Sequence, residues 1–223
     1  MMNRYTSLLN LSTFSKEKLN LLQSKRVLII GVGGVGQHIS TYLITNGINH
    51  LTIVDFDKVE LSNLNRQILL TENDVGKYKV DVVKIALQNK NKEADISAIN
   101  FKINKDNIRD IISNYDVIID SVDNWESKLV IAEAIKGKNT LHLHVGVDGD
   151  RGQYCLFKNK SLLDLVDTSI KSSPHDGVMG PMVGVLSSLA SLHLLRYLAG
   201  EDVEVDTLYF FEQDSNSIGK MKI

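Results

Sequence analysis

The sequence predicts an α/β fold with a mostly parallel sheet, helices on both faces of the sheet and antiparallel strands at the C-terminal end. Short apolar runs alternate with amphipathic segments along most of the chain, and this alternation is typical of parallel sheets. The first apolar run precedes a glycine-rich stretch, GVGGVG, which is followed by a helical pattern. The last segments, 205–213 and 218–223, are short and strand-like, and they predict a terminal antiparallel hairpin.

The remaining elements follow in chain order. Residues 1–22 carry loosely periodic apolar positions, which indicate an N-terminal helical arm. Strands are expected at Val27–Ile30, Leu51–Asp55, 96–101, 116–124, Leu141–Val145 and 153–157. Helices are expected at Val35–Asn46, Asp74–Gln88, Asn107–Ser113, Glu126–Lys136 and Met179–Leu198. This order predicts one Rossmann-like domain over residues 1–223, with a crossover loop at 159–178.

Two of the helices carry more specific expectations. The segment Asp74–Gln88 should bury one apolar face, formed by Val75, Tyr78, Val82, Ile85 and Ala86. The stretch 178–195 contains no Lys, Arg, Asp or Glu, which predicts a helix buried on most of its faces. Because this stretch is about as long as a bilayer is thick, a membrane-spanning helix is the alternative.

Bulk composition narrows the class of protein. A chain of 223 residues with a net charge of −2 offers no electrostatic argument for a nucleic-acid partner. Its single cysteine excludes an internal disulfide and a structural zinc site built from cysteines. The N-terminal segment has no continuous apolar core and no small-residue cleavage site, so it is not a secretory signal. We therefore expect a cytoplasmic protein.

The glycine-rich stretch is the first candidate for a binding site. Gly31, Gly33 and Gly36 satisfy the G-x-G-x-x-G pattern between a predicted strand and a predicted helix. Such a loop brings backbone N–H groups to a helix N-terminus, where they favour a phosphate. Asp55 ends the second predicted strand, where a carboxylate can hold a ribose hydroxyl. The alternative is a tight strand–helix turn that binds no ligand.

Further polar residues extend this candidate site beyond what dinucleotide binding requires. They are Asp57, Asn63, Arg66, Gln67, Lys79, Asp123 and Asn124. Arg66 can clamp phosphate oxygens with its planar guanidinium, and Lys79 can add a point charge. Asp123 lies at the carboxyl edge of the sheet, where one carboxylate together with phosphate oxygens can hold magnesium. Solvated surface positions remain the alternative for these residues, and for Lys79 in particular.

Five segments together resemble one protein family: GVGGVG, LTIVDFDKVELSNLNRQ, VGKYKV, VIIDSVDN and GVMGP. They resemble the family of ThiF, MoeB and HesA, bacterial relatives of the ubiquitin-activating enzymes. The resemblance implies an ATP-dependent adenylyltransferase, usually a homodimer, that activates the C-terminal carboxylate of a small ubiquitin-like protein such as ThiS or MoaD. It further implies that Gly34 and its neighbours face ATP phosphates and that Asp55 holds the ribose. Asn63, Arg66 and Lys79 would bind phosphate, and Asp123 would carry magnesium.

The chain departs from the family at three places. The two C-x-x-C pairs of a structural zinc site are absent, and the crossover-loop cysteine of many relatives is replaced near Ser173. The single cysteine, Cys155, is expected to be a buried core thiol rather than a nucleophile. His175 and Asp176 are candidate substrate contacts or ordinary loop residues. Ser7 stands where relatives often carry an arginine that reaches the partner subunit, so Arg4 is the candidate replacement.

Alternative functions stay open at this point. One is adenylylation of a short ribosomal precursor peptide, similar to the microcin-maturing branch of the family. A second is a nucleotide-binding interaction protein without turnover. A third is an NAD-dependent oxidoreductase, which the set of Arg66, Lys79 and Asp123 argues against because hydride transfer does not need it.

Overall fold

The computed structural model describes residues 4–172, 177–214 and 217–223, and its strands form a sheet in the order β3-β2-β1-β4-β5-β6-β7-β8. The strands are β1 (Arg26–Ile30), β2 (His50–Asp55), β3 (Asp95–Asn100), β4 (Val117–Asp120), β5 (Leu141–Asp148), β6 (Arg151–Phe157), β7 (Thr207–Glu212) and β8 (Ser217–Lys222). The pairs from β3 to β5 are parallel, and those from β5 to β8 are antiparallel. The predicted fold class and the terminal hairpin are thus confirmed.

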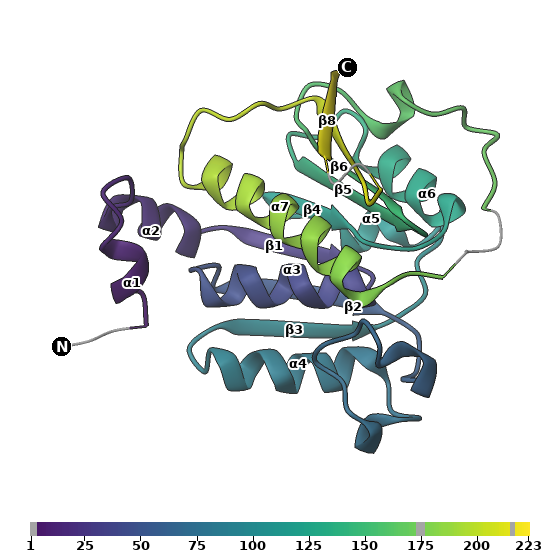
Figure 1. The fold of residues 1–223 in the computed structure, drawn as a ribbon, viewed down its shortest axis with the longest axis horizontal. Coiled ribbons are helices and arrows are strands. Elements are labelled where there is room, and N and C mark those ends of the chain that lie inside the picture. The colour runs from purple at the N-terminus through teal and green to yellow at the C-terminus, as the bar shows by residue number, and fades with distance from the viewer. Residues whose placement is uncertain (1–3, 173–176, 215–216) are drawn as a thin grey trace.

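Helices cover both faces of the sheet (Figure 1). They are α1 (Thr6–Leu9), α2 (Lys16–Gln23), α3 (Gly34–Thr45), α4 (Lys79–Lys90), α5 (Ile108–Ile111), α6 (Trp125–Ile135) and α7 (Gly180–Leu198). Buried apolar residues of α3, α4 and α7 belong to one cluster, whereas Ile108 of α5 and three residues of α6, Ile131, Ala134 and Ile135, belong to a second cluster. The second cluster lies on the opposite face, because neighbouring residues of β1 alternate between the two.

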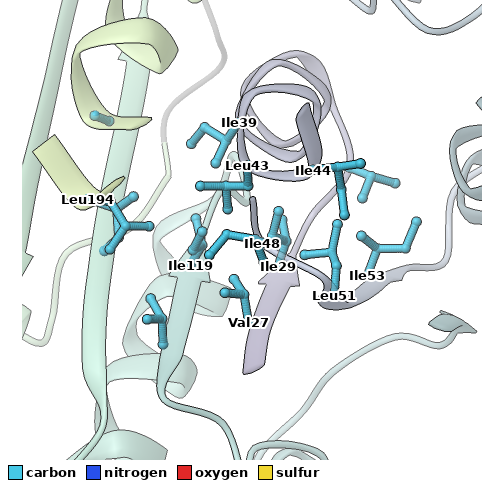
Figure 2. Close-up of a cluster of buried hydrophobic side chains, with 14 of the residues drawn as sticks. Val27, Ile29, Ile39, Leu43, Ile44, Ile48, Leu51, Ile53, Ile119 and Leu194 are labelled. Atoms are coloured by element: carbon cyan, nitrogen blue, oxygen red, sulfur yellow. The ribbon is translucent and has the colours of Figure 1, made fainter. Parts of the chain in front are cut away.

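Strand β1 shows how the core is built. Val27 and Ile29 pack into the cluster beneath α3, whereas Leu28 and Ile30 pack toward α5 and α6. Figure 2 shows Val27 and Ile29 below the α3 side chains Ile39 and Leu43. Each fully buried aliphatic side chain of this kind contributes on the order of 2 kcal/mol of transfer free energy. A strand that is buried on both faces has a continuous run of apolar residues, and this run is why the sequence predicts β1 well.

Helix α4 differs from its prediction in both start and orientation. It begins at Lys79 rather than Asp74, because residues 72–74 form a separate 3₁₀ turn and Tyr78 lies in a bridge with Lys58. Its buried apolar positions are Val80, Val83 and Leu87. The predicted buried face is therefore wrong: the most exposed of its members are Val75 (48%), Tyr78 (41%) and Ile85 (64%).

Two other boundaries also move. The N-terminal arm is two short helices separated by a turn, rather than one helical segment. Strand β4 ends at Asp120, so the following residues, 121–124, form a loop at the carboxyl edge instead of continuing the strand. This places Asp123 in a loop that faces the glycine-rich turn.

Helix α7 packs one long face against α3 and the sheet. Its buried positions are Met182, Val183, Leu186, Ser187, Ala190, Ser191, Leu194 and Leu198. Among the helices of the described ranges, none is long and apolar enough to cross a membrane. The connection that leads to α7 is fastened to α6, because Ser172 Oγ donates to Glu126 Oε2 at 2.8 Å and accepts from the Trp125 N–H at 2.7 Å.

The glycines of the first loop allow a stability test. A Cβ atom at Gly36 would collide with the carbonyl oxygen of Gly31, which is backbone and cannot turn away. A Cβ atom at Gly33 would meet nothing closer than 3.9 Å. Gly36→Ala should therefore lower the free energy of unfolding by about 2 kcal/mol or more. Gly33→Ala is the matched control and should stay within about 0.5 kcal/mol of wild type.

Urea unfolding of both variants, followed by circular dichroism, measures this difference. Equal stabilities for the two alanine variants would contradict the close contact between Gly36 and Gly31.

Candidate active site

A cavity of about 880 Å³ opens at the carboxyl edge of the parallel strands and extends over β5, β6 and β7. Of the residues predicted for the site, its lining includes Gly31, Gly33, Gly34, Asp55, Asp57, Asn63, Arg66, Gln67, Lys79, Asp123 and Asn124. Gly36 is not part of the lining, and its lack of a side chain serves the packing of α3 against Gly31. The structure thus brings residues from five separate segments to one cavity.

The glycine loop is tied to the second strand by Asp55. Asp55 Oδ2 accepts from the Val32 N–H and its Oδ1 accepts from the Asp57 N–H, both at 2.8 Å. Burial of this carboxyl raises its pKa above the ordinary value. Each oxygen keeps a further lone pair for a hydroxyl donor. Asp55 therefore shapes the loop and can also accept from a ligand.

The segment around Arg66 is wedged between two helix starts. A Cβ atom at Gly34 would lie 3.4 Å from Arg66 Cγ, and one at Gly180 would collide with the carbonyl oxygen of Asn65. The Arg66 guanidinium donates to Ser62 O at 3.0 Å and to Asn65 Oδ1 at 2.9 Å. No carboxylate of the described residues pairs with it. Its charge is therefore available to an anion in the cavity.

Two amides of the same segment have structural partners. Asn63 is buried, and its Oδ1 accepts from the Glu60 N–H at 3.1 Å. Gln67 is buried as well, and its Oε1 accepts from Gln37 Nε2 at 3.2 Å. Both amides line the cavity, but part of their hydrogen-bonding capacity holds the segment in place.

Lys79 is not a solvated helix lysine. Its side chain is 8% exposed, and Nζ donates to Asp57 Oδ2 at 2.9 Å. The Lys79 N–H also bonds to the carbonyl of Asp57 at 2.9 Å. The second acid of the Asp55–Asp57 segment thus positions an ammonium group in the cavity wall.

Asp123 is exposed at the cavity edge, and its neighbour Asn124 begins α6. The Asn124 side chain accepts from the Ser127 N–H at 2.9 Å as a helix cap and donates to Asp123 Oδ1 at 3.3 Å. Among the described residues no group of three His, Cys, Asp or Glu side chains could hold a metal ion. A cation bound by Asp123 would therefore need most of its ligands from a bound ligand and water.

Sequence reasoning missed a buried polar chain behind the cavity. Asp120 is fully buried and accepts from Lys128 Nζ at 3.1 Å and from His144 Nδ1 at 2.9 Å. Burial alone would raise the pKa of Asp120, but the Lys128 ammonium and the neighbouring His142 and His144 hold it well below the ordinary value. Gln153 Nε2 contacts His144 Nε2 at 3.3 Å. The signal in the sequence is the spacing of His142 and His144, which places both on one face of β5.

Other predicted features have definite places. Cys155 is completely buried, and burial raises the pKa of its thiol to about 12, so its expected role as a core thiol is confirmed. The Arg4 guanidinium donates to the Lys90 carbonyl at 2.8 Å within the same chain. Ser173, His175 and Asp176 lie outside the described residues.

Comparison with known proteins yields the following matches. The ThiF family model matches residues 5–223. A probable molybdopterin-synthase adenylyltransferase from Gracilaria tenuistipitata var. liui is 31% identical over 80% of this chain, which spans only 52% of that relative's length. The Escherichia coli molybdopterin-synthase adenylyltransferase is also 31% identical, over 89% of this chain and 83% of that protein. E. coli MccB solved with ATP superposes with a TM-score of 0.86 at 23% identity, over 99% of this chain and 71% of that one.

The polar chain predicts a dependence of stability on pH. Burial, with Lys128 nearby, lowers the pKa of His144 from 6.5 to about 4. In the unfolded chain the His144 imidazole therefore binds a proton below about pH 6.5, whereas in the folded chain it stays neutral down to about pH 4. The free energy of unfolding therefore has its full value with respect to this group above pH 6.5, and it should fall by about 3 kcal/mol as the pH drops to 4.

Urea unfolding of the wild type and of His144→Asn between pH 7.5 and 4.5 measures this pH-dependent contribution of His144 to the free energy of unfolding. The variant should start less stable than the wild type and should lose less stability on acidification. An unchanged slope in His144→Asn would contradict the assignment.

Proposed function

This chain belongs to the ThiF family, and on that premise we propose that it uses ATP to adenylylate the C-terminal carboxylate of a small ubiquitin-like carrier of the ThiS or MoaD type. Residues 1–223 act as one adenylation domain in this proposal, and the reaction takes place in the cytoplasm, where ATP is available. The single observation that carries the proposal is the convergence of Arg66, Lys79 and the start of α3 on the cavity that Asp123 borders.

These groups suit a polyphosphate. The first N–H groups of α3 have no intrahelical acceptor and lie at the cavity wall, where they favour an anion. Arg66 and Lys79 add two positive charges, and the Asp57 carboxylate restrains Lys79. Asp55, beside the glycine loop, has the remaining lone pairs to accept from the ribose.

Asp123 suits a magnesium ion that arrives with ATP. It is an exposed carboxylate that lines the same cavity as Arg66 and Lys79, and Asn124 donates to one of its oxygens. Magnesium prefers oxygen ligands and is commonly held by one or two carboxylates plus phosphate oxygens and water. When bound, it would neutralise phosphate charge and polarise the phosphoryl oxygens.

The chemistry of the substrate explains why the cavity needs cations rather than a base. A C-terminal carboxylate has a pKa of about 3.5 and is already ionised at pH 7, so no proton has to be removed. Its obstacle is the negative charge of the α-phosphate. Arg66 and Lys79 reduce that repulsion and stabilise the charge that passes to the departing pyrophosphate. The residues of this chain therefore act by binding, orientation and charge neutralisation.

A thiol step through Cys155 is not part of the proposal. The sulfur is fully buried in an apolar cluster with Phe157 and Leu162, and its raised pKa disfavours the thiolate that a nucleophile requires. Adenylylation of a short precursor peptide is the second candidate, because the fold is shared with MccB, which was solved with the peptide MccA.

Measurement of ATP–pyrophosphate exchange tests the proposal directly. Purified ThiS, MoaD and the MccA peptide are added separately to the protein with ATP and magnesium, and exchange is expected with a carrier protein. Exchange with the peptide alone would favour the second candidate. ATP binding without exchange would indicate an interaction protein. Calorimetry that detects NAD binding and no ATP binding would overturn the nucleotide assignment.

Removal of single charged groups should lower turnover without unfolding the protein. Arg66→Ala and Asp123→Ala should each slow exchange on the order of a hundredfold, because each removes a preorganised group beside the transferred phosphoryl. Arg109→Ala and Asp110→Ala, which change exposed charges on α5, are the matched controls. Rates near wild type for Arg66→Ala and Asp123→Ala, with thermal unfolding unchanged, would refute the proposed roles.

We also predict that the protein forms a homodimer through an exposed apolar face of α7. Helix α7 exposes Val185 (39%) and Leu192 (58%), which lie two turns apart on one face, beside Tyr42 (37%) of the adjacent helix α3. Figure 1 shows α3 and α7 side by side on one face of the sheet. The N-terminal arm is tied through Lys18 to Glu201, which follows the end of α7, and Val185 and Leu192 stay exposed. A second copy could cover it by two-fold symmetry.

Light scattering at micromolar concentration should therefore give about twice the 24.9 kDa chain mass. Leu192→Glu should shift the protein toward the monomer, and Ile85→Glu, an equally exposed apolar position on α4, should not. A wild-type monomer that still catalyses exchange would show that the interface is not required.

A further inference from the structure

The part of the cavity over β5, β6 and β7 differs from the part around the glycine loop. Its surface is formed by Gly146, Gln153 and Phe210, and its rim carries charges of both signs, with Asp148 and Glu212 near Arg151. The sheet register places Gly146 opposite Gln153 and Gln153 opposite Phe210. The Phe210 ring lies over Gly219, on the side of β7 away from Gln153. A surface with balanced charge does not favour a polyphosphate, which leaves this half for the second substrate.

Gln153 reaches this surface at the end of the buried polar chain. Ionised Asp120 can only accept hydrogen bonds, so the proton between it and His144, at 2.9 Å, belongs to His144 Nδ1. A neutral imidazole with its proton on Nδ1 has a lone pair on Nε2. Gln153 Nε2, at 3.3 Å, must therefore be the donor in the next contact.

The neutral state of His144 has a clear physical cause. The ring is fully buried, Lys128 Nζ bonds to the same Asp120 carboxylate and also to the Val145 carbonyl at 3.0 Å, and Trp125 stacks on it with ring centroids 6.2 Å apart. The carboxylate is thus already paired with the Lys128 ammonium, and a second cation has no partner. Burial and this neighbouring charge lower the pKa of His144 to about 4.

Because Gln153 Nε2 must donate to His144, the orientation of the Gln153 amide is fixed. With Nε2 turned toward His144, the carbonyl oxygen Oε1 points the other way, and one N–H remains. Gly146 lies directly beside this pair: a Cβ atom there would come within 3.8 Å of both Gln153 Cγ and His144 Nε2. The absence of that side chain leaves the amide open to the cavity. An acceptor oxygen repels phosphates and carboxylates but suits a peptide N–H.

We propose that Gln153 is a specificity-determining residue whose Oε1 accepts a hydrogen bond from a backbone N–H of the substrate's C-terminal peptide segment, that Gly146 provides the space for that segment, and that His144 is a positioning residue for Gln153. The proposal rests on the proposed function, because the peptide N–H belongs to the acyl substrate. The segment passes over Gly146 and presents its carboxylate to the nucleotide half beside Asp123.

Kinetic variants separate this contact from ATP binding. The acyl probe is whichever of ThiS, MoaD or MccA supports exchange by the wild type. Gln153→Met keeps the length of the side chain and should raise the KM for that probe roughly three- to tenfold, with the KM for ATP unchanged. Gly146→Ala fits within the protein and should raise the same KM, because its methyl group occupies the substrate's space. Gln213→Met, at an exposed position after β7, is the control.

The positioning role of His144 has its own readouts. Asn at position 144 can still donate to Asp120 but is too short to reach Gln153, so His144→Asn should raise the acyl KM to a similar extent. The double variant His144→Asn/Gln153→Met should be no worse than the more impaired single variant. ¹⁵N NMR of the wild-type imidazole should show the neutral form with the proton on Nδ1. In Gln153→Glu, which cannot donate to Nε2, His144 should carry a second proton.

Each result has one meaning. An unchanged acyl KM in Gln153→Met and in Gly146→Ala would overturn the substrate contact, while exchange by the wild type would leave the proposed function standing. Additive effects in the double variant, or a wild-type His144 protonated on Nε2, would overturn the positioning role. Absence of exchange by the wild type with all three probes would overturn the proposed function and the contact together.

Discussion

The candidate site depends on one constraint, the close approach of backbone segments at the carboxyl edge of the sheet. Gly31 has a φ of +93°, a conformation that side chains rarely permit, and Gly36 packs against its carbonyl group. Gly34 and Gly180, at the starts of α3 and α7, lie against the backbone and side-chain stem of the Asn65–Arg66 segment. Because these contacts are made by backbone atoms, they position Arg66 next to a helix start without requiring any one strong interaction.

Charge is organised differently in the wall and behind it. Lys79 is buried and paired with the half-exposed Asp57. The ammonium group is therefore held in place, while the Asp57 carboxylate remains in contact with solvent. Behind the wall, Asp120 and Lys128 are both buried, and the remaining carboxylate oxygen is occupied by His144. A buried pair of this kind is weak evidence for added stability, since desolvation opposes the attraction. Its better documented use is to specify one arrangement of its neighbours, and here the neighbour that is fixed is Gln153.

The sequence predicted the features that are encoded locally. The apolar run of β1, the glycine turn and the terminal hairpin follow from periodicity and turn chemistry, and the glycine loop and Asp55 lie where the motif placed them. The start of α4 was missed because Tyr78 pairs with Lys58 across a distant loop, a contact that no helical pattern encodes. The chain from Asp120 through His144 to Gln153 was missed for a similar reason. Its three members come from three strands, and only the sheet register brings them together.

The two halves of the cavity pose opposite electrostatic problems, and the fold solves them with different strands. The parallel strands end in loops and helix starts, whose N–H groups and cations can neutralise a polyphosphate. The antiparallel strands β5 to β7 present a sheet face, where side chains alternate and a single glycine, Gly146, can open a path. A carboxylate that moves along this face meets the mixed charges of Asp148, Arg151 and Glu212 at its rim, and the cationic groups Arg66 and Lys79 only in the nucleotide half. Electrostatic attraction therefore acts at the reacting end, and recognition along the path depends on hydrogen bonds and space. For this reason the orientation of one amide, Gln153, can matter as much to the choice of substrate as the charged residues do to the reaction.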